Sequence, residues 1–347
     1  MTSQSAPRDF AWALIGPGAI AHRFAQAVHQ LPGTYLHTVV GRNAAKAQAF
    51  ANTWSRDGKP HPHATDDLAA VLCHPAIDAV YIATPHAQHG ELVRQCLLAG
   101  KAVLCEKPLV PTAHQAQALM ALARTQGVFL MEALWSRFLP IYKVVGDWLQ
   151  SGAIGDVHAV QSSFCFQVDY NPHSRLFNPA LAGGSLLDIG IYNLAMSRWA
   201  LQHSPGMAGQ CPEPLHMQAH GRLSPSGVDQ RLSALLAFPG GISVQFVCGF
   251  DTSADNGMSI YGSHGSIVLA HNFWEATEAT LMRRGQSAHT QQAPFRINGF
   301  EGEIEEVIRC VRAGQLQSPC MPHSETLTLI TWMDALRAQV GVRYPFT

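Results

Sequence analysis

The strongest constraint on the fold of this chain is a glycine-rich turn near its start. The turn reads Gly16-Pro17-Gly18-Ala19-Ile20-Ala21, a G-x-G-x-x-A pattern, and it directly follows the apolar run 11–15. A short unbroken apolar run is typical of a buried parallel strand. We predict a helix over residues 20–30 and a second apolar strand over residues 36–40. Together these elements predict the first part of a doubly wound α/β domain.

Each small residue of this turn has a physical reason. Gly16 permits the sharp turn off the strand, Gly18 lets phosphate oxygens reach the backbone, and Ala21 lets the helix pack closely on the strand. The start of the helix directs backbone amides at a bound anion. We therefore predict a dinucleotide site, with a glycine turn that binds no ligand as the alternative. The pyrophosphate is expected to contact Gly16, Gly18, Ala19 and Ile20.

The residue after the second strand indicates which dinucleotide binds. An NAD site usually has Asp or Glu here, which accepts a hydrogen bond from the ribose 2′-hydroxyl, whereas Arg can hold a 2′-phosphate. Here the strand ends at Gly41-Arg42-Asn43, and no acid lies between Gly33 and Asn52. We predict NADP rather than NAD, with Arg42 selecting it; a solvated loop cation is the alternative.

Length and composition limit the classes of function. The chain has 347 residues, of which 47% are hydrophobic and 14% charged, and its formal net charge is −1. This length allows two domains with their own cores. The near-neutral charge gives no electrostatic basis for nucleic-acid binding, and the apolar runs are too short to span a membrane. We therefore expect a globular protein that binds small molecules.

The cysteines and the start of the chain point to the cytoplasm. The eight cysteines are scattered without a C-x-x-C pair, as expected of buried thiols in a reducing compartment. The first nine residues lack the basic and apolar segments of a secretory signal. The pairs His61/His63 and His86/His89 lack the neighbouring ligands of a metal site, so we expect no metal.

The order of strand and helix patterns predicts two domains. Over residues 10–132, strand patterns alternate with helical ones, which predicts a Rossmann-type parallel sheet with helices on both faces. Over residues 133–347, alternating strand patterns with Pro/Gly-rich turns predict an α+β domain around a large, mainly antiparallel, open-faced sheet. Because charges are few, we expect a second subunit to cover the open face, in a homodimer or homotetramer.

Two segments carry the predicted chemistry. The sequence Glu106-Lys107-Pro108 follows a strand, and the carboxyl ends of parallel strands are where ligands bind. Lys107 can hold positive charge beside a developing alkoxide. A helix is expected over residues 184–201, where Asp188 and Tyr192 lie four residues apart and would share a face.

These motifs together resemble the Gfo/Idh/MocA oxidoreductase family. The resemblance spans nearly the whole chain, from the glycine-rich turn through E-K-P at 106–108 and D-x-G-x-Y at 188–192 to the closing Tyr344-Pro345-Phe346. Tyr192, where many members have histidine, and M-E-A-x-W-x-R-F at 131–138 are similar to the branch of dihydrodiol, glucose–fructose and xylose oxidoreductases. The resemblance implies NADP, oligomerisation through the open sheet, and catalysis by Lys107 and Tyr192.

We hypothesise that Tyr192 takes a proton from a substrate hydroxyl while hydride moves from the carbon to nicotinamide. A free tyrosine has a pKa of about 10, so the phenolate needs a nearby cation, which Lys107 would supply. Asp188 would orient Lys107 or a substrate hydroxyl. For Tyr192 the alternative is a core tyrosine on an amphipathic helix. In the family pattern Gly41 replaces a common serine or alanine, which leaves NADP selection chiefly to Arg42.

The remaining site residues are assigned by their place in the pattern. Those expected to contact the cofactor are Thr84, Pro85, His89, Glu106 and Lys107. Those expected to contact the substrate are Trp135, Arg137 and Arg175.

The predicted function is therefore an NADP-dependent dehydrogenase or reductase that acts on a CH–OH group of a sugar, polyol or cyclic vicinal diol. One alternative is a cofactor-binding regulator without catalysis, against which the presence of both Lys107 and Tyr192 argues. Another is an aldose–ketose oxidoreductase or redox glycosidase that retains its cofactor, which a co-purifying nucleotide would reveal.

Overall fold

The computed structural model describes residues 8–55, 58–207 and 209–346, so most of the polar stretch at the start of the chain lies outside the described residues. The chain divides into two compact units. The first comprises residues 1–109, 115–133 and 296–323, and the second comprises 110–114, 134–295 and 324–347. The main break lies close to the predicted boundary at 132. The prediction was wrong for 296–323, which return to the first unit, and for 110–114, which join the second.

The first unit is built on a six-stranded parallel sheet in the order β3-β2-β1-β4-β5-β6. Its strands are β1 (Phe10–Ile15), β2 (Thr34–Val40), β3 (His63–Thr65), β4 (Ala79–Ile82), β5 (Ala102–Glu106) and β6 (Leu130–Ala133). Its helices are α1 (Ala19–Gln30), α2 (Ala44–Thr53), α3 (Leu68–Cys73), α4 (His86–Leu98), α5 (Ala113–Gln126) and α8 (Glu301–Arg312). Right-handed crossovers place α1 and α4 on opposite faces, because the order reverses between β1 and β4.

The strands at the centre of this sheet are buried on both faces. Every residue of β1 and β4 is buried, as expected when helices cover both sides. Aromatic side chains fill the space under α1, where Phe24 stacks on Tyr81 with ring centroids 3.8 Å apart and meets Trp12 edge-on at 5.1 Å. This core fixes the carboxyl ends of β1, β4 and β5 along one edge, where the predicted cofactor residues lie.

The second unit is built on an eight-stranded sheet in the order β14-β13-β12-β11-β7-β10-β9-β8. Its strands are β7 (Val157–Cys165), β8 (His216–Leu223), β9 (Asp229–Ala237), β10 (Ser243–Gly249), β11 (Met258–Gly262), β12 (Gly265–Leu269), β13 (Glu278–Arg283) and β14 (His289–Gln292). Only the pair of β7 and β10 is parallel among these described strands, which confirms the mainly antiparallel sheet. The consecutive strands β10 and β11 do not pair, because β7 lies between them.

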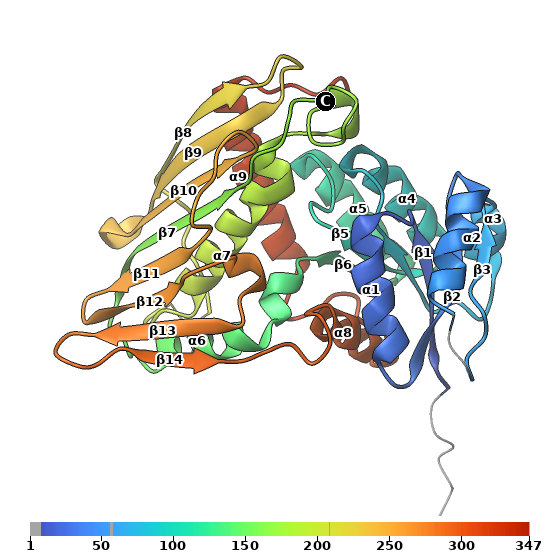
Figure 1. Ribbon diagram of the computed structural model, residues 1–347, viewed down its shortest axis with the longest axis horizontal. Coiled ribbons are helices and arrows are strands. Elements are labelled where there is room, and N and C mark those ends of the chain that lie inside the picture. The colour runs from blue at the N-terminus through green and yellow to red at the C-terminus, as the bar shows by residue number, and fades with distance from the viewer. Residues whose placement is uncertain (1–7, 56–57, 208, 347) are drawn as a thin grey trace, which may run out of the picture. The chain divides into compact units, whose positions relative to one another are not determined.

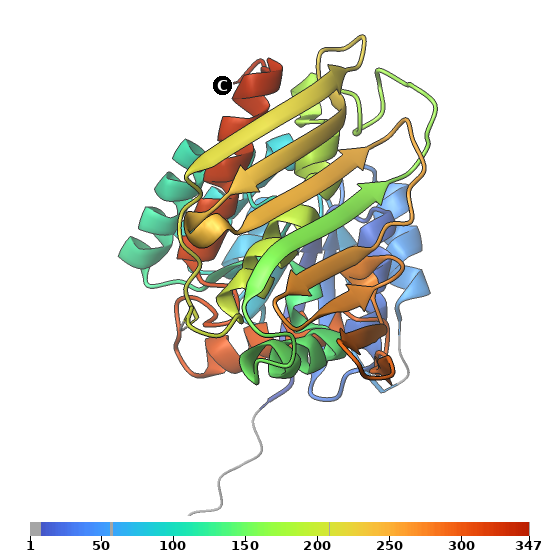
Figure 2. The same ribbon diagram turned by 90° about the vertical axis from the view of Figure 1, so that its left-hand side faces the viewer.

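Helices cover one face of this sheet and leave the other open. Figure 1 shows α6 (Pro140–Gln150), α7 (Ile191–Gln202) and α9 (His323–Val340) on the covered face. All residues of α7 from Ile191 to Leu201 are buried, so this helix is central to the unit. Figure 2 looks onto the opposite face, across which none of the described α-helices lies. Short 3₁₀ turns occur at Trp135–Phe138, Pro179–Leu181, Pro239–Gly241 and Phe273–Glu275.

No helix in the described part of the chain combines the length and apolar character that a membrane span requires.

Candidate active site

The glycine-rich turn has the geometry expected of a dinucleotide site. Gly16 has a φ of +91°, and a Cβ at this position would lie 2.8 Å from the carbonyl oxygen of Ala83. A Cβ at Gly18 would meet only the carbonyl oxygen of Gly16, at 4.0 Å. The fold itself therefore requires glycine at position 16. Gly18 faces open space, where a ligand could approach the backbone.

The start of α1 offers backbone donors to an anion. No side chain caps this helix, and its first turn contains no acidic residue. The first amides of a helix have no partner within the helix, so they can hold a phosphate group. Ala19 and Ile20 are exposed here, Ile20 to 37%. These residues fit the predicted contacts with a pyrophosphate.

The loop after β2 carries an exposed arginine that has no ion-pair partner among the described residues. Arg42 is exposed, and it makes no hydrogen bond or ion pair with any residue that the structure describes. Gly41 is explained by packing, because a Cβ there would lie 3.1 Å from Cγ of Pro17. The glycine that departs from the family pattern thus makes room for the proline of the phosphate-binding turn.

A buried hydroxyl without a partner lies at the end of β4. The Oγ1 atom of Thr84 is buried and has no hydrogen-bond partner among the described residues. A buried polar group without a partner is unfavourable, so a cofactor group that bonds to Thr84 would satisfy it. Pro85 follows at the start of α4 and is half-buried.

His89, a predicted cofactor residue, is bonded to two backbone carbonyls. Its side chain is fully buried, and its two ring nitrogens lie 2.9 Å from the carbonyl oxygen of Pro108 and 2.8 Å from that of Thr84. Burial lowers the pKa of its imidazole. The contact of His89 with the cofactor stays a prediction. The ring ties the loop after β4 to the loop after β5.

The E-K-P segment combines a buried carboxyl with a half-buried lysine. Glu106 is 7% exposed and accepts a hydrogen bond of 2.6 Å from the phenol of Tyr81. Lys107 is half-buried, and its peptide bond to Pro108 is cis. Glu303 of α8 is fully buried, and burial followed by the charge of Glu106 raises its pKa well above the usual value.

In the second unit, Tyr192 lies at the start of α7 beside Trp135. The indole Nε1–H of Trp135 donates a hydrogen bond of 3.0 Å to the phenol oxygen of Tyr192. The two side chains come from segments 57 residues apart and are 3% and 6% exposed. A tyrosine whose oxygen already accepts one hydrogen bond is held in orientation for proton transfer.

Aromatic rings continue around Tyr192. The ring of Phe164 lies 5.8 Å from that of Tyr192 and stacks in parallel on Trp274. Trp135 in turn lies 6.3 Å from Phe295. This aromatic cluster of Trp135, Phe164, Tyr192, Trp274 and Phe295 is suited to the face of a ring-shaped substrate.

The helix that carries Tyr192 begins with a π-helical turn. This turn spans Leu186–Gly190 and contains Asp188, after which the α-helix starts at Ile191. Asp188 is 4% exposed and accepts a hydrogen bond of 2.7 Å from the guanidinium of Arg175. The structure thus brings two of the predicted site residues together. π-Turns inside helices are often found at functional sites.

Arg137, a predicted substrate residue, forms a buried ion pair. Its side chain is 7% exposed and forms an ion pair of 2.9 Å with the buried carboxylate of Glu325. Arg198 and Gln202 bind the other oxygen of Glu325 at 3.0 and 2.8 Å. The guanidinium thus belongs to a buried cluster, and the contact of Arg137 with the substrate stays a prediction. No group of metal-ligating side chains occurs among the residues that the structure describes.

Comparison with known proteins places the chain in a family. Residues 10–134 match the model of an oxidoreductase family with an NAD-binding Rossmann fold, the Gfo/Idh/MocA family. Residues 142–268 match the model of the C-terminal domain of the same family. The chain belongs to the Gfo/Idh/MocA oxidoreductase family. Its first unit is a nicotinamide-dinucleotide domain, and the protein is an oxidoreductase of CH–OH groups, as predicted.

Relatives within the family match the chain from end to end. Trans-1,2-dihydrobenzene-1,2-diol dehydrogenase of Mus musculus is 32% identical over 341 residues, which cover 96% of this chain and 98% of the relative. A solved 3-ketoreductase of Actinomadura kijaniata, in complex with TDP-benzene and NADP, has a TM-score of 0.79 at 25% identity, over 97% and 99% of the two chains. The aldose-aldose oxidoreductase of Caulobacter crescentus has a TM-score of 0.83 at 23% identity, over 96% and 97%, and shows the same fold.

No sequence motif marks some of the residues that lie in or beside the candidate site of this protein. Tyr81 and Glu303 carry no motif, and Phe164 and Trp274 lie in ordinary strand and loop patterns. Their importance depends on contacts between distant segments, such as the hydrogen bond of Tyr81 to Glu106.

Proposed function

We propose that this oxidoreductase uses NADP to transfer hydride to or from a CH–OH carbon of a cyclic vicinal diol or a sugar. The end-to-end similarity to a dihydrodiol dehydrogenase supports this substrate class. The observation that carries the proposal is the hydrogen bond from Trp135 to Tyr192, within a cluster of aromatic rings. It combines an oriented proton-transfer group with a surface for a ring.

Tyr192 is the proposed acid or base. In oxidation its phenolate takes the proton of the substrate hydroxyl, and in reduction its phenol returns a proton to the oxygen. The Trp135 N–H donates to the same oxygen and so favours the negative charge that develops on it. Lys107 is the proposed cation that stabilises both the phenolate and the substrate alkoxide.

Asp188 and Arg175 are proposed to position the substrate. The carboxylate of Asp188 is nearly buried, while the side chain of Arg175 is 54% exposed. Their ion pair presents donors and acceptors of fixed direction, as neighbouring hydroxyls of a diol or sugar require. Because the pair is neutral as a whole, it favours uncharged substrates over phosphorylated or acidic ones.

The residues of the first unit support NADP as the cofactor. NADP supplies the hydride-accepting nicotinamide ring when it is bound. Gly18 and the start of α1 would hold the pyrophosphate of NADP. The hydroxyl of Thr84, which has no hydrogen-bond partner among the described residues, would form a hydrogen bond with the cofactor. Arg42, exposed and uncommitted, would hold the 2′-phosphate. Its complex with NADP makes the Actinomadura kijaniata ketoreductase a supporting precedent.

Steady-state kinetics test this proposal. Formation of NADPH is followed by absorbance with a trans-dihydrodiol, xylose and glucose, and NAD replaces NADP as the control. We expect turnover with NADP on a ring-shaped diol, and loss of turnover with retained NADP binding in Tyr192→Phe and Lys107→Met. Tyr35→Phe, at a half-buried tyrosine of β2 in the first unit, is the matched control and should retain activity. Full activity of Tyr192→Phe would contradict the proposal.

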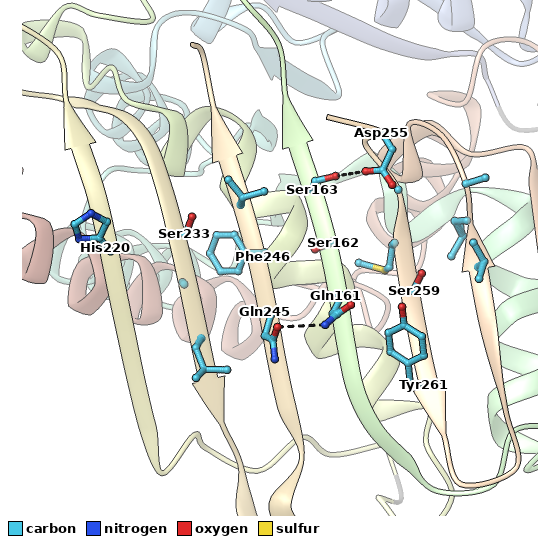
Figure 3. Close-up of a pocket in the computed structure, with 18 of the residues that line it drawn as sticks. Gln161, Ser162, Ser163, His220, Ser233, Gln245, Phe246, Asp255, Ser259 and Tyr261 are labelled. Carbon is cyan, nitrogen blue, oxygen red and sulfur yellow. Dashed lines mark hydrogen bonds between the residues drawn. The ribbon is translucent and has the colours of Figure 1, made fainter. Parts of the chain in front are cut away.

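We also infer that the open sheet face pairs with a second copy of the chain. A shallow hollow of about 760 Å³ lies on this face, and Asp255 is the one carboxylate among the residues that line it. Figure 3 shows its floor, where Gln245 bonds to Gln161 and Ser163 bonds to Asp255. The exposed apolar side chains Leu235 and Tyr261 border it, at 42% and 39% exposure. A hollow lined by so few charges, with exposed apolar side chains at its border, favours burial against another subunit.

Sedimentation measurements test this pairing. The cross-strand row Leu235–Gln245–Gln161 runs through the middle of the face, so Gln245→Arg should turn an oligomer into a monomer. Leu98→Arg, at an exposed apolar residue of α4 in the first unit, is the control and should leave the assembly unchanged. A wild-type monomer would contradict the inference.

The eight cysteines are all free thiols, which supports a reducing compartment such as the cytoplasm.

A further inference from the structure

A buried carboxylate from the sheet holds the first turn of the helix that carries Asp188 and Tyr192. Asp229 is the first residue of β9 and is 1% exposed. Its Oδ2 atom accepts hydrogen bonds of 2.8 Å from the hydroxyl of Ser185 and 2.6 Å from the backbone N–H of Leu186. Leu186 is the first residue of the π-helical turn. Asp229 therefore caps this helix from a different element.

This cap replaces the usual local one. Ser185 precedes the helix, where a serine side chain commonly accepts from a helix amide, but its hydroxyl donates to Asp229 and caps no amide. The negative charge of Asp229 also lies at the positive end of the helix dipole. The helix is thereby tied to the sheet at its first residue, which sets the direction of all later side chains.

The backbone on the other side of Asp229 is equally constrained. Gly184 has a φ of +121°, and a Cβ there would overlap Oδ1 of Asp229 and approach the hydroxyl of Tyr344. That hydroxyl donates a hydrogen bond of 2.6 Å to the carbonyl oxygen of Gly183. Figure 1 shows the end of the chain next to the loop that precedes α7. Asp229 and Tyr344 thus hold the glycine turn between them.

We propose that Asp229 is a positioning residue of the reaction: by binding Ser185 and Leu186 it fixes the π-turn, and so the orientation of Asp188 and Tyr192. This rests on the proposed function, in which Tyr192 transfers the proton. π-Turns are rare and need support from their surroundings. A buried carboxylate oxygen that accepts two hydrogen bonds at the first turn provides such support, whereas a helix that only required stability could use its own serine.

The protonation of Asp229 provides an independent signature. Burial raises the pKa of this carboxyl to about 6, against the opposing effect of its hydrogen bonds from Leu186 and Ser185. The other titratable or charged groups that face it are Cys248 of β10, Tyr344, and Arg337 of α9. Burial raises the pKa of the Cys248 thiol and of the Tyr344 phenol, so both are neutral near pH 6. Among these side chains, Asp229 is the one with a pKa of about 6.

Kinetics of matched variants test the proposal. Asp229→Ala removes both hydrogen bonds and should lower kcat about 10- to 100-fold, the usual effect of misplacing a catalytic group by about 1 Å. NADP binding, which belongs to the first unit, should change by less than about 2-fold. Asp229→Asn retains the shape and an acceptor oxygen but not the charge, so its kcat should equal that of wild-type protein in which Asp229 is protonated. It should also abolish an acid limb of the wild-type kcat profile centred near pH 6.

A control aspartate separates positioning from loss of stability. Asp251→Ala removes a half-buried aspartate of the second unit, which pairs with Arg231 at 3.2 Å and with Arg222 at 3.5 Å. It should leave kcat unchanged. Equal losses in both alanine variants, or an acid limb that persists in Asp229→Asn, would overturn the proposal.

Amide hydrogen exchange separates this proposal from the proposed function. Asp229→Ala should speed exchange across residues 184–192, and Asp251→Ala should not. If wild-type protein gave no NADP-dependent turnover, the proposed function would fail, and faster exchange in this segment would still show that Asp229 holds the turn. Unchanged exchange in Asp229→Ala would overturn the positioning role whatever the activity.

Discussion

The indole N–H of Trp135 lies 3.0 Å from the phenol oxygen of Tyr192, and both side chains are almost completely buried. A donor fixed in this way cannot be replaced by water. It orients the phenol and stabilises negative charge on it, so the hydrogen bond has a direct kinetic consequence.

Trp135→Phe should lower kcat without weakening NADP binding. The change keeps an aromatic ring but removes the N–H, and a hydrogen bond to a charged group contributes about 1.5–3 kcal/mol. We therefore expect kcat to fall about 10- to 100-fold in stopped-flow or steady-state kinetic assays. Trp148→Phe, at a tryptophan that contacts His289, is the control and should be near wild type. An unchanged kcat in Trp135→Phe would show that the phenol needs no such donor.

Gly18→Ala should separate cofactor binding from folding. A Cβ at Gly18 meets only one protein atom, at 4.0 Å, so the thermal midpoint should stay within about 1 °C of wild type. The same Cβ would occupy the space of a phosphate oxygen, so NADP affinity measured by calorimetry should fall at least about 10-fold. Gly16→Ala is the contrast, because its φ of +91° and its contact with Ala83 should lower the thermal midpoint itself. Equal NADP binding by Gly18→Ala and wild type would exclude the turn as a phosphate site.

Arg42→Asp should reverse the choice of cofactor. A carboxylate repels the 2′-phosphate of NADP and accepts a hydrogen bond from the 2′-hydroxyl of NAD. We expect the ratio of kcat/KM for NADP to that for NAD to fall by about 100-fold or more. Lys143→Asp reverses an exposed cation of α6 and should leave the ratio alone. Retained preference for NADP in Arg42→Asp would assign the selection to another residue.

Glu303→Gln should stabilise the protein at alkaline pH. The fully buried Glu303 has a pKa well above its usual value of 4.5, chiefly because burial disfavours its charge. Above pH 4.5 the unfolded carboxyl loses its proton while the folded one keeps it. The folded state then binds more protons, so the free energy of unfolding falls as pH rises toward the folded pKa.

Thermal melts across the pH range measure this effect. Near pH 4 the variant and wild type should melt alike, and near pH 8 the variant should melt about 2–5 °C higher. Glu305→Gln, on the exposed side of the same helix, should show no such rise. If the melting temperature of the wild-type protein instead rose with pH relative to that of Glu303→Gln, the fold would stabilise Glu303 as an anion, which would contradict this prediction.

Local patterns predicted much of the fold. The run of buried residues in β1, the glycine turn and α1 form a continuous signal, and the structure reproduces them within one or two residues. By contrast, β14 is a run of exposed polar residues, and α2 has a weak apolar face, so neither was predicted. The return of residues 296–323 to the first unit depends on long-range contacts, such as those of Asn298 with Arg23 and Gln26, which the sequence pattern does not contain.

The candidate site likewise contains residues that the sequence could predict and residues that it could not. Lys107, Asp188 and Tyr192 could be named because motifs mark them. The π-turn could not be predicted, because its hydrogen-bond pattern leaves no mark on residue types, and the partners of Tyr192 and Leu186 lie 57 and 43 residues away. A motif position also does not reveal that the side chains of Arg137 and His89 are buried against protein partners.

Hydride transfer itself can be measured with a substrate that carries deuterium on its CH–OH carbon. Mass spectrometry of the NADPH formed should find deuterium on the nicotinamide ring with wild-type protein. Tyr192→Phe, with NADP still bound, should form almost none. A wild-type protein that binds NADP but transfers no deuterium from any cyclic diol or sugar, or a Tyr192→Phe variant that transfers it at the wild-type rate, would contradict the proposed function.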